Sequence, residues 1–224
     1  GTGAMSIHLN SFAENLLLVE IDQDMIKIIE EIVSLKDVVK LNQSFLNLQE
    51  VQILDYLPRG YDIVGNLPYY ITSPCIEHVL LSLKQWRNAY FMVQKEVAQR
   101  ILARPHSKEY GRLSVFCQLL AKIELISNVP RGCFQPVPNV DSSFIRFTRN
   151  SLLDGSDLKH ALDLVKIGFS QRRKQLKGLL KKSYPGIDWQ AGMKLLCLQD
   201  TSRAENLSID QWVKLACWSL DKAC

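Results

Sequence analysis

Hydrophobic positions in the first 149 residues form short runs separated by segments with helical spacing. The runs over 16–21, 38–41 and 61–65 have the length of buried strands, whereas apolar residues three and four apart over 24–33 fit one face of a helix. Strands that alternate with helices in this way predict a parallel sheet with helices on both faces.

The same pattern continues with a helix that Thr72 or Ser73 is expected to cap, and then with further elements. We predict a helical segment after Gly3, helices over 73–83 and 96–102, and strands over 89–93, 119–128 and 143–148. A loop rich in Pro and Gly, residues 129–140, joins the last two strands without a helix, which predicts an antiparallel edge.

After residue 149 the pattern is helical only. Residues 150–156 are the predicted linker, and helices are expected over 157–168, 171–182, 189–197 and 206–220. The chain is therefore predicted to hold an α/β, doubly wound domain over residues 1–149 and a small all-α domain over 150–224.

Composition limits the classes of protein. Of the 224 residues 47% are hydrophobic and 22% charged, which is typical of a globular protein, and no apolar run reaches the length of a membrane helix. The six cysteines form no C-x-x-C pair. We expect them to be free thiols in a reducing compartment, which favours a cytoplasmic protein without a metal site.

The positive charge is concentrated in the last third of the chain. Residues 1–149 hold 15 basic and 15 acidic side chains, whereas residues 150–224 hold 12 and 8. Half of these 12 lie within residues 172–182, where no acidic residue occurs. A solvated helix face is one explanation, and phosphate contact with structured RNA is the other. The candidate RNA-binding residues are Arg172, Arg173, Lys174, Lys177, Lys181 and Lys182.

Two segments near the start of the chain are candidate cofactor ligands. Gly1 and Gly3 precede a helical segment, where glycine lets the backbone approach a ligand, although an expression scar ahead of Met5 would look the same. Glu20 ends the next strand, where a carboxylate can accept hydrogen bonds from both ribose hydroxyls of a nucleoside. A solvated strand end is the alternative for Glu20.

The segment Asn66-Leu67-Pro68-Tyr69 follows an apolar strand, so it is expected at a carboxyl end of the sheet, where open α/β sheets bind ligands. It is either a simple turn or a pocket for an exocyclic amine. The Asn66 side-chain carbonyl and the Leu67 backbone carbonyl can each accept an N–H bond, Pro68 stiffens the loop, and Tyr69 can stack on a planar base. Such a site suits methylation of adenine N6, because two acceptors expose the nitrogen lone pair and stabilise its developing positive charge.

Several blocks together resemble one family, the ribosomal RNA adenine N6,N6-dimethyltransferases of the KsgA/RsmA type, within the class I S-adenosylmethionine-dependent methyltransferase fold. The similar blocks are Gly1–Ser6, Val19–Asp22, Val64–Ile71, Met92–Ala98, Tyr110–Val115, Pro136–Ser142 and Phe169–Lys174. The resemblance implies S-adenosylmethionine as cofactor, a Rossmann-like domain and a helical RNA-binding domain.

The resemblance also assigns site residues and shows two departures from the family. The catalytic residues it implies are Asn66, Leu67, Pro68 and Tyr69, and the cofactor ligands are Gly1, Gly3, Glu20, Ile21, Gln43, Ser44, Phe45 and Asn66. Ser44 stands where the family usually has Asp, so a negative charge near the cofactor adenine is absent. The family's first strand is expected to precede the glycine motif and is not part of this sequence.

The implied reaction is transfer of methyl groups to N6 of two adjacent adenosines in a hairpin near the 3′ end of small-subunit ribosomal RNA. The implied partner is this RNA or an immature small (30S-type) subunit; we expect a monomer without membrane association, although the sequence leaves open an organellar form. Two alternatives stay open, namely a catalytically weak or inactive checkpoint in subunit assembly and a DNA adenine methyltransferase.

Overall fold

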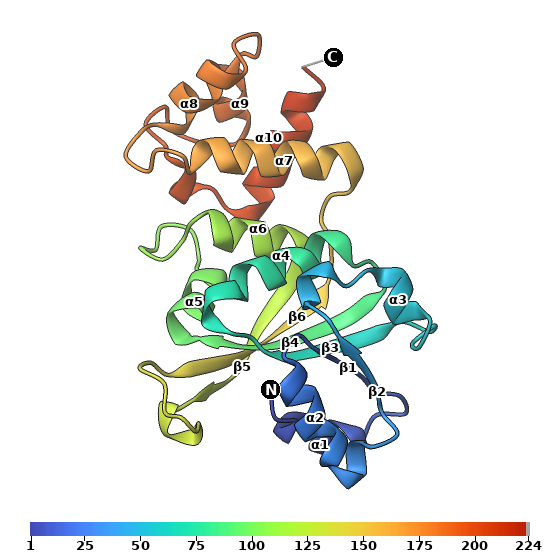
Figure 1. Ribbon diagram of the computed structural model, residues 1–224. Coiled ribbons are helices and arrows are strands. Elements are labelled where there is room, and N and C mark those ends of the chain that lie inside the picture. The colour runs from blue at the N-terminus through green and yellow to red at the C-terminus, as the bar shows by residue number, and fades with distance from the viewer. Residues whose placement is uncertain (223–224) are drawn as a thin grey trace. The chain divides into compact units, whose positions relative to one another are not determined.

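The computed structural model describes residues 1–222, which form two compact units (Figure 1). The first unit comprises residues 1–63 and 67–87, and the second comprises residues 64–66 and the chain from residue 88 onward. Within the described residues no helix is both long enough and apolar enough to cross a membrane.

The first unit contains a two-stranded parallel sheet with short helices around it. Strand β1 (Leu17–Glu20) pairs with β2 (Val39–Asn42), as the strand–helix alternation predicted. The helices of this unit are α1 (Ala4–Asn10), α2 (Gln23–Glu31), α3 (Glu50–Leu54) and α4 (Thr72–Ser82), together with short 3₁₀ segments at Val33–Leu35, Phe45–Asn47 and Tyr69–Ile71.

A second sheet has four strands. Strand β6 (Ser142–Arg149) pairs antiparallel with both β4 (Trp86–Gln94) and β5 (Ala121–Val129), and β3 (Tyr61–Asn66) lies next to β4, so the strand order is β3–β4–β6–β5. The antiparallel β5–β6 pair confirms the predicted edge. Residues Ala89, Phe91, Val93, Ile145 and Phe147 alternate along β4 and β6 and are almost fully buried, so one face of this sheet belongs to the core.

The second unit contains the helices α5 (Lys95–Ile101), α6 (Arg112–Leu120), α7 (Gly155–Gly168), α8 (Leu176–Ser183), α9 (Trp189–Leu195) and α10 (Ile209–Leu220), with a short 3₁₀ segment at Ala204–Asn206. Helices α6 to α10 share one apolar core. Val115 and Leu119 of α6 are buried in the same cluster as Leu164 of α7 and Trp212 of α10. The domain boundary at residue 150 stays a prediction.

Three predicted elements were wrong in detail. The strand expected from residue 119 begins at Ala121, because α6 occupies the preceding apolar run and its first turn is held by the Gly111 N–H, which donates to the Ser114 hydroxyl at 3.0 Å. The helix expected from residue 171 begins at Leu176, whose N–H donates outward to the Ser202 carbonyl at 2.9 Å.

The third error concerns the cap of α4. Neither Thr72 nor Ser73 caps this helix, since Ile71 occupies the N-cap position without a side-chain hydrogen bond. The Thr72 hydroxyl instead donates to the carbonyl of Pro68 at 3.1 Å. This bond ties the start of α4 to the Asn66–Tyr69 loop.

Glu50, at the start of α3, is a polar anchor of the first unit. Its carboxylate accepts the backbone N–H groups of Lys84 and Gln85 at 2.7–2.9 Å and the Tyr61 hydroxyl at 2.7 Å. We expect Glu50→Gln to lower the free energy of unfolding by about 1–3 kcal/mol, because an amide group would face donors that need an acceptor. Urea denaturation measures this loss. Glu31→Gln, at an exposed site, is the control, and equal losses in both variants would contradict the assignment.

His160 of α7 is the buried polar side chain of the helical core, with 9% of its surface exposed. Its Nε2 lies 2.8 Å from the Ser219 hydroxyl, and its ring packs edge-on against Tyr184. The Ser219 hydroxyl itself donates to the Ala216 carbonyl at 3.1 Å, so its oxygen is left to accept from the imidazole Nε2–H.

Burial lowers the pKa of His160 below its ordinary value, and Asp163 and Asp157 only partly oppose this shift. The unfolded chain therefore binds this proton more readily than the folded chain, and stability should be lost as pH falls below about 6.5 toward the folded pKa. In His160→Gln this contribution is absent. The difference in Tm between the wild-type protein and this variant should shrink as pH is lowered from about 8 to about 5. A difference independent of pH would contradict the burial of a neutral imidazole.

Candidate active site

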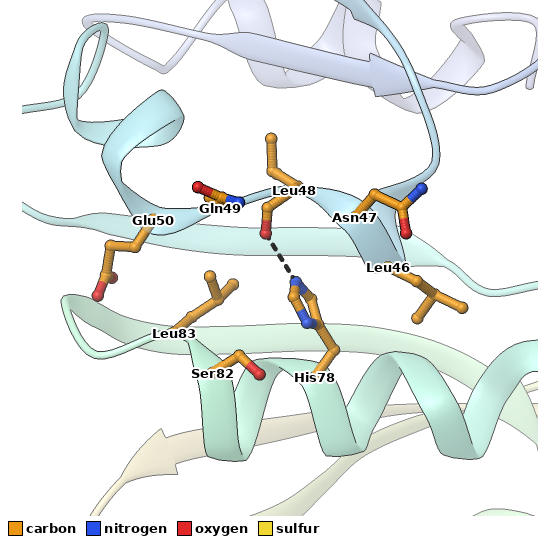
Figure 2. Close-up of a pocket in the computed structure, with 8 residues that line it drawn as sticks. All are labelled: Leu46, Asn47, Leu48, Gln49, Glu50, His78, Ser82 and Leu83. Carbon is orange, nitrogen blue, oxygen red and sulfur yellow. Dashed lines mark hydrogen bonds between the residues drawn. The ribbon is translucent and has the colours of Figure 1, made fainter.

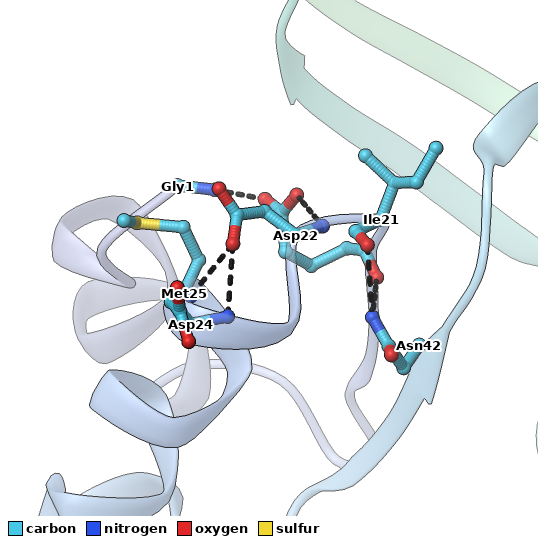
Figure 3. A network of polar contacts seen from close by, with 7 residues as sticks. Gly1, Ile21, Asp22, Asp24, Met25 and Asn42 are labelled. Atoms are coloured by element: carbon cyan, nitrogen blue, oxygen red, sulfur yellow. Dashed lines mark hydrogen bonds and ion pairs between the residues drawn. The ribbon is translucent and has the colours of Figure 1, made fainter.

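The ends of β1 and β2 bring two predicted cofactor segments together. The parallel register places Glu20 opposite Asn42, and the Asn42 side-chain amide donates to the backbone carbonyls of Glu20 and Ile21 at 2.9 and 3.1 Å (Figure 3). Gln43 follows Asn42 in the chain. The residues around positions 20–21 and 42–45 thus lie side by side in the first unit.

The Glu20 carboxylate is held in place by the turn that follows β1, since its Oε1 accepts the Asp22 N–H at 2.9 Å. Partial burial raises the pKa of Glu20, whereas hydrogen bonds from the backbone of Asp22 and Ile21 lower it. A carboxylate has about four lone-pair sites, which leaves capacity to accept the two hydroxyls of a ribose.

Asp22 and Asn42 hold the predicted cofactor residues in place, a role that the sequence analysis did not assign to them. The Asp22 side chain caps α2 by accepting the N–H groups of Asp24 and Met25 at 2.8 and 3.3 Å (Figure 3). This cap fixes the turn that presents Glu20 and Ile21. The sequence did hold a signal for Asp22, because an Asp directly before a helical pattern is typical of an N-cap. It held none for Asn42, whose partners depend on the register of β1 and β2.

Gly3 requires glycine for two reasons. Its φ of +81° is in the left-handed region, and an added Cβ would lie 3.2–3.3 Å from side-chain atoms of Ile29, Ile32 and Leu35. The residue therefore begins α1 in close contact with the α2 region. Gly3 belongs to the folded structure, and its role in cofactor binding stays a prediction, as does that of Gly1.

The predicted cofactor segment 43–45 contains three side chains with different contacts. The Ser44 hydroxyl accepts the Leu46 N–H at 3.3 Å, and the Phe45 ring packs edge-on against His78 with centroids 5.4 Å apart. The side-chain Nε2 of Gln43 is buried and has no hydrogen-bond partner among the described residues. A buried donor without a partner is costly, and a ligand acceptor such as a ring nitrogen would satisfy it.

The Asn66–Tyr69 loop follows β3 directly, as the sequence predicted. Leu67 is 8% exposed and anchors the loop in the core, whereas Tyr69 and Tyr70 are exposed. The Pro68 carbonyl accepts both the Ile71 N–H and the Thr72 hydroxyl at 3.1 Å. These two bonds fix the end of the loop that leads into α4. Its catalytic assignment and its union with the cofactor residues in one site stay predictions.

The six candidate RNA-binding residues fall into two groups. Arg172 is paired with Glu205 at 3.0 Å and Lys177 with Asp200 at 3.0 Å, so both charges are partly neutralised within the protein. The other four, Arg173, Lys174, Lys181 and Lys182, are exposed. Arg172, Arg173 and Lys174 precede α8 in a turn, which corrects the prediction that they lie on the helix.

An open pocket of about 590 Å³ lies elsewhere in the first unit, between the 46–50 segment and α4 (Figure 2). Its polar groups serve the fold, because His78 Nε2 bonds the Leu48 carbonyl at 2.9 Å and Glu50 holds the start of β4. None of the predicted site residues lines it. Within the described residues there is no group of three metal-ligating side chains.

Comparison with known proteins agrees with this geometry. The family model for ribosomal RNA adenine dimethylase matches residues 1–220. "Ribosomal RNA small subunit methyltransferase A" of Trichormus variabilis is 35% identical over 96% of this chain and 83% of its own length, and the protein of the same name from Rippkaea orientalis is 36% identical over 95% and 82%.

Solved structures show the same fold. A dimethyladenosine transferase from Plasmodium falciparum superposes with a TM-score of 0.81 at 23% identity, covering all of this chain and 88% of the other. The 23S rRNA methyltransferase ErmE gives a TM-score of 0.73 at 25% identity, covering 96% and 86%. The fold is that of a class I methyltransferase with a helical C-terminal part, the cofactor is S-adenosylmethionine, and the chain belongs to the ribosomal RNA adenine dimethylase family.

Proposed function

We propose that this protein transfers methyl groups from S-adenosylmethionine to N6 of two adjacent adenosines in a hairpin near the 3′ end of small-subunit ribosomal RNA. The observation that carries the proposal is the Asn66–Tyr69 loop at the end of β3, with its carbonyl acceptors next to an exposed tyrosine. The relatives named for the small subunit support this choice of RNA. We also propose the cytoplasm as its compartment and the immature small subunit as its partner.

The chain's own residues supply positioning and electrostatics. The target adenine leaves its stack and lies against the Tyr69 ring, while Asn66 and the Leu67 carbonyl accept the two N6 hydrogens. These bonds pull the amine toward tetrahedral geometry, so its lone pair points at the electrophile, and they stabilise the positive charge that develops on nitrogen. When bound, S-adenosylmethionine supplies an electrophilic methyl group on a sulfonium. The chemistry needs alignment above all, since the attack is an in-line displacement.

A second transfer can use the same loop. After the first attack the positively charged N6 releases one proton to water and keeps one hydrogen. Either carbonyl can accept a hydrogen bond from it, so no further catalytic group is needed. Asn66 is exposed, and Pro68 adds no backbone N–H to the loop, so the Asn66 side-chain carbonyl and the Leu67 carbonyl stay available as acceptors for the amine. This arrangement accounts for dimethylation by one site.

Asn66→Ala tests the assignment of the loop. Losing one of the two acceptors should reduce the rate of methyl transfer by about 10²–10³-fold, while RNA affinity stays near that of the wild-type protein. Single-turnover transfer of labelled methyl groups to small-subunit RNA measures the rate, and filter binding measures the affinity. Asn150→Ala, at an exposed position, is the control. Near-normal turnover of Asn66→Ala would overturn the proposal.

Glu20→Gln tests the cofactor half of the site separately. Removing the charged acceptor should weaken binding of S-adenosylhomocysteine by about tenfold to a hundredfold, because hydrogen bonds to a charged group are worth about 1.5–3 kcal/mol. Calorimetric titration measures this affinity without turnover. Glu30→Gln removes an exposed carboxylate from α2 and should bind the cofactor product normally. Equal affinities of both variants for S-adenosylhomocysteine would show that Glu20 does not contribute to cofactor binding.

A further inference from the structure

Three segments distant in the sequence meet at one place in the second unit. They are residues 103–111, which join α5 to α6, residues 169–175, which precede α8, and residues 203–207, which precede α10. The Tyr110 hydroxyl donates to the Leu207 carbonyl at 2.8 Å, and its ring packs edge-on against Phe169. The His106 N–H donates to the Glu205 carbonyl at 2.9 Å. These contacts fix the three segments to one another.

Arg172 is the side chain that links all three segments. Its Nη2 donates to the carbonyl of Lys108 at 2.5 Å, and its Nε donates to the Glu205 carboxylate at 3.0 Å. Two of the five N–H donors of this guanidinium, Nε–H and one Nη2–H, are thus engaged by acceptors from two other segments of the protein. Arg172 therefore holds the surface together.

The side chains around this link carry an excess of positive charge. The three segments contain six cationic side chains and two acidic ones, and one of the two, Glu205, is paired with Arg172. The other acidic residue is the exposed Glu109. Lys108, Arg173 and Lys174 are exposed, and the Arg172–Lys108 bond places the backbone of Lys108 beside the turn that carries Arg173 and Lys174.

We propose that Lys108 binds RNA phosphate together with Arg173 and Lys174, and that Arg172 positions this surface through Glu205 and the Lys108 carbonyl. Exposed, mobile ammonium and guanidinium groups in a common patch are the usual ligands of an RNA backbone, which presents one negative charge per nucleotide. Lys108 lies 64 residues from Arg172 in the sequence. The charge pattern of residues 172–182 therefore could not reveal it. The proposal rests on the proposed function for its partner, structured RNA.

Lys108→Ala tests the new contact. The probe is a synthetic RNA hairpin with two adjacent adenosines in its loop, titrated with the full chain at several salt concentrations. Removing one phosphate contact should weaken binding by about threefold to tenfold and lower the slope of log K against log salt by about 1. Lys214→Ala removes the same charge from an exposed position on α10 and should change neither value by as much. An unchanged slope in Lys108→Ala would overturn the proposal.

Glu205→Gln tests the positioning role of Arg172. This change leaves the guanidinium charged but removes its ionic partner. If Arg172 itself bound phosphate, freeing it would strengthen binding and steepen the salt slope. If it positions Lys108, binding should weaken by about twofold to fivefold with a shallower slope. Circular dichroism confirms that each variant is folded. Stronger binding by Glu205→Gln would overturn the positioning role.

These experiments are independent of methyl transfer. A wild-type protein that binds the hairpin with the expected slopes but transfers no methyl group would refute the proposed function and leave the surface intact. Normal transfer together with an unchanged slope in Lys108→Ala would refute only the surface.

Discussion

The Asn42 side chain holds together the half of the site that is built from β1 and β2. A parallel pair leaves backbone carbonyls without partners where its strands end, and Asn42 satisfies two of them, those of Glu20 and Ile21. With these carbonyls fixed, the Glu20 side chain turns back to accept the Asp22 N–H, and Asp22 in turn caps α2. One amide thus helps to position the Glu20 carboxylate at the end of β1. The geometry is set before any cofactor arrives, which reduces the entropy lost on binding.

The loop after β3 is also held by one polar group that makes two hydrogen bonds. Here the Pro68 carbonyl is the fixed point, since it accepts two donors from the start of α4. Proline also removes a backbone N–H from the loop, so no donor of its own competes for the Asn66 and Leu67 acceptors. The proposed amine pocket needs acceptors, and a proline in the loop lowers the number of backbone donors near them.

The sequence predicted features that depend on local pattern. The β1–β2 and β5–β6 pairs, the helix after Gly3 and the place of Asn66 at the end of β3 follow from apolar periodicity and turn residues. It could not separate α6 from β5, because an apolar run continues across residue 120 and both elements are buried at this point. It also missed Asn42 and the Lys108–Arg172 contact, since both depend on which distant segments become neighbours. The bond from Leu176 to Ser202 shortened the predicted basic helix for the same reason.

Charge pairing within the helical part changes how the basic run should be understood. Arg172 and Lys177 form ion pairs with Glu205 and Asp200, which partly neutralise their charges. Residues 172–182 therefore present fewer unpaired cations to RNA than their six basic side chains suggest. The paired cations instead fix the shape of the surface, and rigid placement lowers the entropy lost when the remaining side chains bind phosphate. Exposed ion pairs add little stability on their own. The Arg172 pair matters for geometry instead, because it fixes the segment of Lys108, whose own side chain is exposed.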